Sequence, residues 1–260
     1  MPYLTHKHAI ITGGGRGIGA AIAAELARLG ASVTLMGRDA ATLQGCAAEL
    51  TAEHRVRALP VVCDVTDEAS VDEAFARARE ALGEPFVLVS NAGQADAAAL
   101  PEMDRAMWDR MMAVNLTGPY LCARAVLPSM LGAGAGRIIN IASTAGLRGY
   151  SRLSAYCASK HGVIGLTRAL AQETAKFGVT VNAVCPGYTE ETLMVRQAIE
   201  TLMRNLHKTE AEATELMLRT SPRRAFVKPA EVANAVAWLC SPDATAVTGQ
   251  AIAVAGGEVM

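Results

Sequence analysis

Residues 12–19 read Thr12-Gly-Gly-Gly-Arg-Gly-Ile-Gly19, between the apolar segment His8–Thr12 and the alanine-rich segment Gly17–Leu29. A strand that passes through a glycine-rich turn into a helix can bind a dinucleotide, because glycine lets the backbone approach the pyrophosphate and the helix N-terminus carries a positive dipole. Glycines also serve ordinary tight turns, and the T-G-x-x-x-G-x-G spacing here differs from the common G-x-G-x-x-G. The strand before and the helix after favour the dinucleotide site, whose expected contacts are Gly13, Gly15, Arg16, Gly17, Ile18 and Gly19.

The alternation of strand and helix continues along the chain. Short apolar or β-branched segments, typical of strands buried on both faces, alternate with amphipathic helical patterns. Such alternation builds parallel βαβ units, so we predict an α/β fold: one doubly wound, Rossmann-type domain over residues 1–260 with a seven-stranded parallel sheet. The expected strands are His8–Thr12, Ser32–Met36, Val56–Val62, Phe86–Ser90, Arg137–Ala142, Val179–Val184 and Gln250–Val254, and the expected helices include Gly17–Leu29, Ala40–Glu53, Ser70–Ala81, Asp104–Leu131, Ser154–Phe177 and Pro229–Cys240.

One segment departs from this alternation. Tyr188–Thr220 is a long, mostly helical stretch of mixed charge that follows Pro186-Gly187. An insertion of this length inside an α/β domain is usually functional. We therefore predict a helical substrate lid at residues 188–220, with a solvated helix pair as the alternative.

Composition narrows the class of protein. The 260 residues carry a formal net charge of −1 without a basic run, which argues against nucleic acid or an anionic membrane as the partner. The six cysteines are scattered without C-x-x-C spacing, as expected of buried thiols in a reducing compartment, so we expect no structural metal. Because the N-terminus lacks the pattern of a signal peptide, we predict a cytoplasmic protein.

The ends of the second to fourth strands indicate the kind of dinucleotide. An acidic residue after the second strand would bind a ribose 2′-hydroxyl, whereas this chain has Gly37-Arg38, with Arg16 nearby, which favours the 2′-phosphate of NADP(H) over NAD(H). Asp39 follows at once and could reach a ribose, so NAD is the alternative. Further expected contacts are Asp64 and Val65 at the adenine, where Asp64 is equally well explained as a helix N-cap, and Asn91, Ala92 and Gly93 after the fourth strand.

Tyr156 and Lys160 form the strongest candidate for chemistry. They lie four residues apart in a helical pattern, hence on one face, and Ser143 lies just past the fifth strand, where it can reach the same cleft. A phenol has an ordinary pKa of about 10, and a neighbouring ammonium can lower it enough for acid/base work. A lone Y-x-x-x-K is more often a surface helix pair, so the argument depends on the joint pattern.

That joint pattern resembles the short-chain dehydrogenase/reductase family over essentially the whole chain. It comprises T-G-G-G-R-G-I-G, S-N-A-G, V-N-L-T-G, the Ser143, Tyr156 and Lys160 set, V-N-A-V-C-P-G and A-V-A-G-G. The resemblance implies a catalytic tetrad: Ser143 orients the substrate oxygen, Tyr156 transfers the proton, Lys160 lowers the pKa of Tyr156 and holds the nicotinamide ribose, and Asn115 anchors a relay water. It also implies cofactor contacts from Tyr156, Lys160, Pro186, Gly187 and Thr189, and a homotetramer built partly from the helices Asp104–Leu131 and Ser154–Phe177.

Two positions depart from the family pattern. A threonine often stands five residues after the proline of P-G, where it contacts the carboxamide; here that position is Glu191, so Thr189 or Thr192 takes this role. Ala255 replaces an aspartate that is not catalytic.

The resemblance is greatest to members acting on 3-hydroxyacyl or 3-oxoacyl thioesters, including polyketide-type ketoreductases. We therefore expect a secondary alcohol/ketone oxidoreductase whose substrate can be linked to CoA or a carrier protein; a small or aryl alcohol is the alternative, and a catalytically silent dinucleotide sensor is a third. Lid cations could meet the phosphates of such a thioester, or simply pair with lid glutamates. The expected substrate contacts are Ser143, Gln94, Leu147, Tyr150, Tyr188 and Met194; the lid cations are Arg196, Arg204, Lys208 and Arg219, and the glutamates Glu200, Glu210, Glu212 and Glu215.

Overall fold

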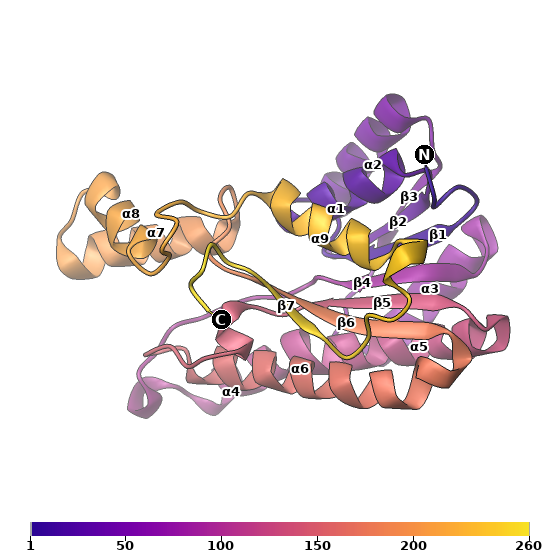
Figure 1. Cartoon of the computed structure of the whole chain (residues 1–260). Coiled ribbons are helices and arrows are strands. Elements are labelled where there is room, and N and C mark those ends of the chain that lie inside the picture. The colour runs from indigo at the N-terminus through magenta and orange to yellow at the C-terminus, as the bar shows by residue number, and fades with distance from the viewer. Residues whose placement is uncertain (1, 260) are drawn as a thin grey trace.

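A computed structural model describes residues 2–259 and contains one parallel sheet (Figure 1). The strand order is β3-β2-β1-β4-β5-β6-β7, and every neighbouring pair is parallel. The predicted seven-stranded, doubly wound sheet is therefore confirmed. Its strands are β1 (His8–Thr12), β2 (Ser32–Gly37), β3 (Ala58–Val62), β4 (Pro85–Ser90), β5 (Gly136–Ile141), β6 (Val179–Pro186) and β7 (Ala251–Val254).

Helices cover both faces of the sheet, as Figure 1 shows. A separate hydrophobic core lies on each face of the sheet, and successive strand residues point to opposite faces. Ile11 packs with α1, α2 and α9, whereas Ile10 packs with α3 and α5. Because both faces are buried, the strands lack the polar alternation of a solvent-exposed sheet. The helices are α1 (Gly17–Arg28), α2 (Ala40–His54) and α9 (Pro229–Leu239) on one face, and α3 (Glu68–Leu82), α5 (Gly118–Ala133) and α6 (Ser154–Thr174) on the other.

The segment predicted as one helix, Asp104–Leu131, is divided in the structure. Asp104 caps α4 (Arg105–Met112), a π-helical turn follows at Ala113–Thr117, and the chain continues into α5. Pro119 has no N–H, so the carbonyl of Asn115 cannot receive the usual bond from the residue four positions on. This accounts for the local widening, a feature common at functional sites.

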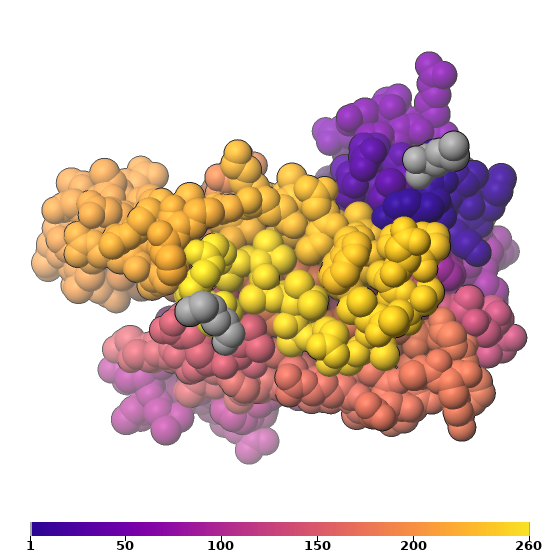
Figure 2. Space-filling view, in the orientation of Figure 1, coloured from indigo at the N-terminus to yellow at the C-terminus, as the bar shows by residue number. Residues whose placement is uncertain are grey.

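The segment predicted as a lid forms two helices that project from the body of the molecule (Figure 2). They are α7 (Leu193–Leu206) and α8 (Glu210–Leu218). Within the described residues, only Val195, Ala213 and Met217 are buried in these two helices. The hairpin formed by α7 and α8 therefore contributes few residues to the hydrophobic core. Within residues 2–259, no helix combines the length and hydropathy needed to cross a bilayer.

Candidate active site

The glycine-rich turn lies where the order of the strands reverses. β1 pairs with both β2 and β4, and such switch points are where open α/β sheets bind ligands. The hydroxyl of Thr12 accepts hydrogen bonds from the backbone N–H groups of Asn91 and Ala92, both at 3.0 Å. The amide of Asn91 donates to the carbonyls of Thr12 and Gly13 at 2.9 and 3.1 Å. The Asn91 side chain therefore joins the turn to the end of β4.

The turn has a shape that requires glycine and leaves a helix end open. Gly13 and Gly17 have φ values of 63° and 54°, and a Cβ on Gly19 would lie 2.1 Å from the Gly13 carbonyl oxygen. Arg16, the residue before α1, makes no side-chain hydrogen bond to the helix, although α2, α3, α4, α7 and α8 are all capped by a side chain. The first N–H groups of α1 are thus available to an anion, which fits the pyrophosphate of a dinucleotide.

The side chains predicted to distinguish NADP from NAD lie in the glycine-rich turn and just after β2 and β3. Arg16 and Arg38 are exposed, as a phosphate-binding role requires. Asp39 instead caps α2, where its carboxylate accepts from the N–H and hydroxyl of Thr42 at 3.2 and 2.9 Å. Hydrogen bonds from Thr66, and then the charge of Arg38, lower the pKa of Asp64. Asp64 does not cap α3, because the residue that does so is Asp67.

Asn115 and Lys160 are buried at the carboxyl edge of the sheet. In the π-helical turn, Asn115 accepts from the N–H of Gln94 at 3.0 Å and donates to the Gln94 carbonyl at 2.9 Å and to the Ser159 hydroxyl at 3.2 Å. The Lys160 ammonium donates a hydrogen bond to the Ile141 carbonyl at 2.8 Å. A Cβ on Gly93 would lie 3.2 Å from Asn115 Oδ1 and 3.6 Å from Lys160 Nζ, so Gly93 lies beside both side chains.

Tyr156 lies in the same cluster with Ser143 beside it. Burial raises the pKa of the phenol to about 12, and the Ser143 hydroxyl opposes part of this shift. Lys160 Nζ is 5.7 Å from the centre of the Tyr156 ring, and burial lowers its pKa to about 8. Desolvation is the largest influence on the pKa of both groups, and the Lys160 ammonium is directed to the Ile141 carbonyl.

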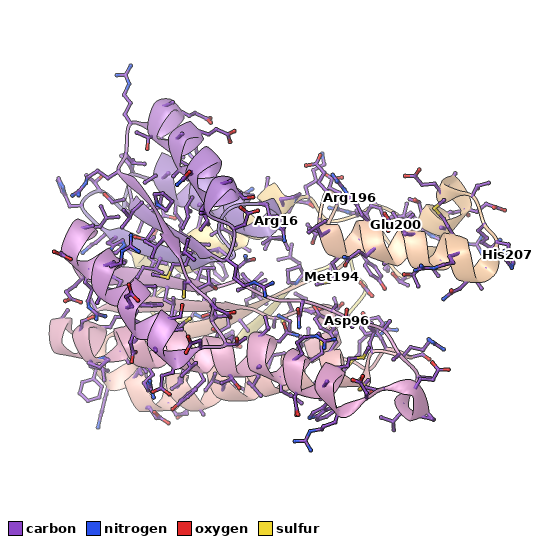
Figure 3. All side chains as sticks on the ribbon, turned by 180° about the vertical axis from the view of Figure 1, so that it is seen from behind. Arg16, Asp96, Met194, Arg196, Glu200 and His207 are labelled. Atoms are coloured by element: carbon purple, nitrogen blue, oxygen red, sulfur yellow. The ribbon has the colours of Figure 1, made fainter. Side chains whose placement is uncertain are left out.

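Several of the expected substrate contacts surround this cluster. The thioether of Met194, on α7, is 3.9 Å from the Tyr156 hydroxyl. Figure 3 shows Met194 at the end of α7 nearest the body and His207 at the far end. Tyr188 is partly buried, and Leu147 is 36 % exposed. Gln94 is oriented by Asn115 through its backbone.

Glu258 lies beside the candidate site, although the sequence pattern does not indicate this. Its Oε1 is 2.5 Å from the hydroxyl of Tyr150, which is also 2.8 Å from Thr144 Oγ1, next to Ser143. Its Oε2 would be 3.0 Å from a Cβ on Gly187. The chain after β7 therefore returns to the active site, a contact between distant segments for which the sequence carries no local signal.

Two threonines follow Pro186-Gly187 and have different surroundings. Thr189 is buried, and its hydroxyl donates to the Gly187 carbonyl at 3.0 Å. Thr192 caps α7, and its methyl carbon is 3.7 Å from where a Cβ on Gly17 would lie. Thr192 therefore lies beside the glycine-rich turn, Glu191 adopts a φ of 60° between the two threonines, and the contact of Thr189 with the cofactor stays a prediction.

Comparisons with known proteins agree with this geometry. The short chain dehydrogenase family matches residues 7–202. The chain is 40% identical to 2-(S)-hydroxypropyl-CoM dehydrogenase 3 of Xanthobacter autotrophicus, over 95% of this chain and 94% of that protein. It is 41% identical to a ketoacyl reductase assigned to the granaticin polyketide synthase of Streptomyces violaceoruber, over 96% and 92% of the two chains. A crystal structure of a substituted actinorhodin polyketide ketoreductase with NADPH superimposes with a TM-score of 0.93 and 39% identity, covering 97% of each chain.

Proposed function

Because the chain belongs to the short-chain dehydrogenase/reductase family, oxidoreductases that act on CH–OH groups, we propose that it interconverts a 3-oxoacyl and a 3-hydroxyacyl thioester with NADP(H). The observation that carries the chemistry is the group formed by the partly buried Ser143 and the buried Tyr156 and Lys160 at the carboxyl edge of the sheet. The choice of NADP(H) rests on Arg16 and Arg38, which are exposed near the ribose end of the turn, while Asp39 is occupied by Thr42.

The dinucleotide supplies or accepts a hydride when bound. Gly13, Gly17 and the open N-terminus of α1 would hold its pyrophosphate, and Arg38 its 2′-phosphate. The protein's own task is then to bind the substrate oxygen and to move one proton. In the direction of reduction the Ser143 hydroxyl hydrogen-bonds the carbonyl oxygen, and the Tyr156 phenol donates its proton to that oxygen as its charge develops.

The phenol acts as the acid in the direction of reduction. At neutral pH a phenol whose pKa is raised to about 12 stays protonated, so it is ready to act as an acid. The reverse reaction needs the phenolate, which a positive charge close to the oxygen must stabilise. Lys160 is near enough to supply that charge if its ammonium turns from the Ile141 carbonyl toward the phenol.

The thioester assignment rests on the relatives and on the charges of the hairpin. A ketoacyl reductase and a polyketide ketoreductase are among the similar proteins. Of the hairpin cations, Lys208 pairs with Glu212 at 3.7 Å and Arg219 with Glu215 at 3.1 Å. Arg196 and Arg204 form no ion pair within residues 2–259, and both are exposed on α7, so they remain available to the phosphates of CoA or of a carrier protein.

A small secondary alcohol is the second candidate, favoured by the similarity to a hydroxypropyl-CoM dehydrogenase. A panel assay separates the two: 3-oxoacyl-CoA, carrier-linked 3-oxoacyl groups and free ketones, each with NADPH and NADH. The proposal expects the highest kcat/KM for a thioester with NADPH. Higher kcat/KM for free ketones would favour the second candidate, and no turnover of any substrate while NADPH still binds would favour a silent dinucleotide sensor.

Two variants test how the thioester is bound. Replacing both Arg196 and Arg204 by glutamine should raise KM for CoA and carrier substrates about tenfold and leave small ketones unchanged, since each lost phosphate contact is charge-assisted. Arg77→Gln, at an exposed arginine on α3, is the matched control. Equal effects on both substrate classes would mean that the two arginines maintain the fold of α7 and do not bind phosphate.

A further inference from the structure

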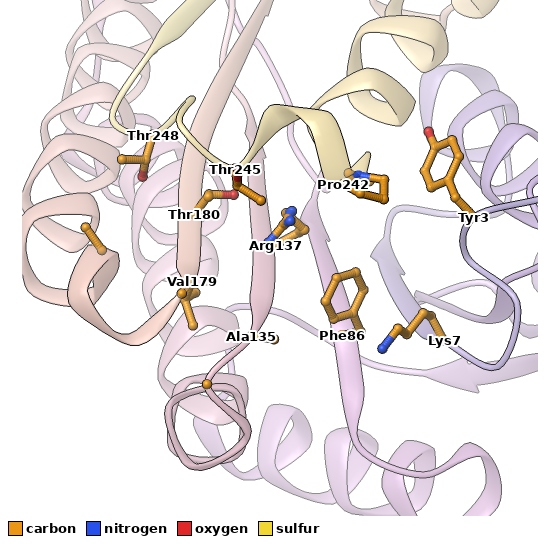
Figure 4. Close-up of a pocket in the computed structure, with 14 residues that line it drawn as sticks. Tyr3, Lys7, Phe86, Ala135, Arg137, Val179, Thr180, Pro242, Thr245 and Thr248 are labelled. Atoms are coloured by element: carbon orange, nitrogen blue, oxygen red, sulfur yellow. The ribbon is translucent and has the colours of Figure 1, made fainter.

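A cavity lies at the edge of the sheet opposite the active site. It has a volume of about 420 Å³ and is bordered by the first residues of β5 and β6, by the start of β4 and by the loop before β7. Figure 4 shows Arg137, on β5, at its centre, with Phe86 and Lys7 to one side. This volume is in the range of small-molecule sites in proteins.

Arg137 is a buried cation without a counter-charge. Only 5 % of the residue is exposed, and its Nε has no hydrogen-bond partner among the described residues. Its Nη1 donates a hydrogen bond to the Gly136 carbonyl at 2.9 Å. No carboxylate of residues 2–259 lies within ion-pair distance of it. Buried charges are normally paired because leaving one unpaired is costly, so the guanidinium points to an anion supplied from outside the chain.

The surroundings of Arg137 specify the chemistry of that anion. The guanidinium carbon is 5.4 Å from the centre of the Phe86 ring, and Lys7 Nζ is 4.6 Å from the same ring. The cavity is thus lined by two cations, and its lining contains no acidic residue within the described chain. Phe86, Val179 and Pro242 supply apolar walls. A bare inorganic ion would leave these walls unused.

We propose that this cavity binds an organic carboxylate with a compact apolar body. The carboxylate accepts hydrogen bonds from the guanidinium of Arg137, whose fork of N–H groups matches the geometry of two carboxylate oxygens. Lys7 adds a second positive charge at the side of Phe86, and the apolar body of the ligand packs against the Phe86 ring. The site is separate from the reaction centre, because Ser143, Tyr156 and Lys160 belong to the opposite edge of the sheet.

Benzoate is a suitable probe, and its neutral isostere benzamide, phenyl phosphate and inorganic phosphate are the comparisons, all at constant ionic strength. The whole protein is titrated while calorimetry follows binding and NMR follows the arginine Nε–H resonances. Benzoate should bind saturably and shift the Arg137 resonance, identified by its loss in Arg137→Lys. Benzamide should not bind, and inorganic phosphate should bind more weakly than benzoate. Phenyl phosphate, which keeps the apolar ring, measures whether a phosphate can replace the carboxylate.

Arg137→Met should weaken benzoate binding about tenfold or more, as loss of charge-assisted hydrogen bonds predicts, while Arg77→Met should bind like the wild type. The melting temperature of Arg137→Met without benzoate should be equal or higher, because the unpaired buried charge is removed. If that variant does not fold, the wild-type NMR titration decides the matter. An unperturbed Arg137 resonance, equal benzoate affinity after Arg137→Met, or equal affinity for inorganic phosphate and benzoate would each overturn the proposal.

Discussion

Replacement of Lys160 by methionine should change how the stability of the protein depends on pH. Burial lowers the pKa of Lys160 from its ordinary 10.5 to about 8. In the interval between these values the unfolded chain binds more protons than the folded protein, so stability increases as pH rises through it. At about 1.36 kcal/mol per pKa unit, the ammonium destabilises the folded protein by about 3 kcal/mol near neutral pH, and this cost disappears by about pH 10.5.

The measurement is urea unfolding of the wild type and of Lys160→Met between about pH 7 and about pH 10. The free energy of unfolding of the wild type should rise by about 2 to 3 kcal/mol relative to the variant over this range. The variant also loses the hydrogen bond to the Ile141 carbonyl, which changes the difference in free energy of unfolding by a similar amount at every pH. Tyr156 is present in both proteins, so its titration contributes to both curves. Lys176→Met, at an exposed lysine, should give a constant difference. A difference for Lys160→Met that is equally constant would refute the argument.

Three further outcomes are expected. Tyr156→Phe should lower kcat about 10³-fold with dinucleotide binding retained, because acid/base catalysis contributes 10²–10⁴-fold; near wild-type turnover of the pure variant would contradict its role. Gly37→Asp combined with Arg38→Ile should shift kcat/KM toward NADH, since a carboxylate repels a 2′-phosphate and binds a 2′-hydroxyl, and a wild type that already prefers NADH would contradict the assignment. Sedimentation at micromolar concentration should show a homotetramer that uses α5 and α6, where Tyr120 and Phe177 are exposed at the start and just past the end of these helices; a monomer would contradict it.

The sheet could be predicted from the sequence because each strand is indicated by a short run of consecutive residues. The seven strand segments are mostly apolar, and the glycine-rich turn fixes how β1 enters α1. The predicted boundaries agree with the structure to within a few residues except at Asp104–Leu131. There Pro119 removes one N–H from the helix ladder, and this produces the π-helical turn around Asn115. The spacing of apolar residues along a helix does not show that one backbone hydrogen bond is missing.

The features that could not be predicted depend on contacts between distant segments. Glu258 approaches Tyr150 and Gly187 only because the chain after β7 turns back to the carboxyl edge of the sheet. Arg137 reads as an ordinary first residue of a strand, and its burial without a partner follows from how β4, β6 and the loop before β7 enclose it. The pKa of Tyr156 likewise depends on how deeply the phenol is buried, which its spacing to Lys160 does not indicate.

The last prediction concerns the hairpin of α7 and α8. Its few buried residues leave Leu193 and Leu206 exposed at 45 % and 51 %, whereas Met194 already lies against Tyr156. Amide hydrogen exchange should therefore be fastest in residues 190–218, because few buried contacts protect them. Addition of NADPH and a substrate should slow that exchange about tenfold or more, with β5 unchanged as the internal control.

The physical reason is that closure would bury the free apolar face of α7 over the substrate. It would also exclude water from the reaction centre, which strengthens the hydrogen bonds of Ser143 and Tyr156 to the carbonyl oxygen. Shortening the hairpin should then raise KM for long acyl thioesters more than for small ketones, because only the longer substrates extend beneath α7. High protection that ligands do not change would identify a fixed wall. An equal rise in KM for long and small substrates would mean that the hairpin only supports the fold, because a lid should affect most the substrates that extend beneath it.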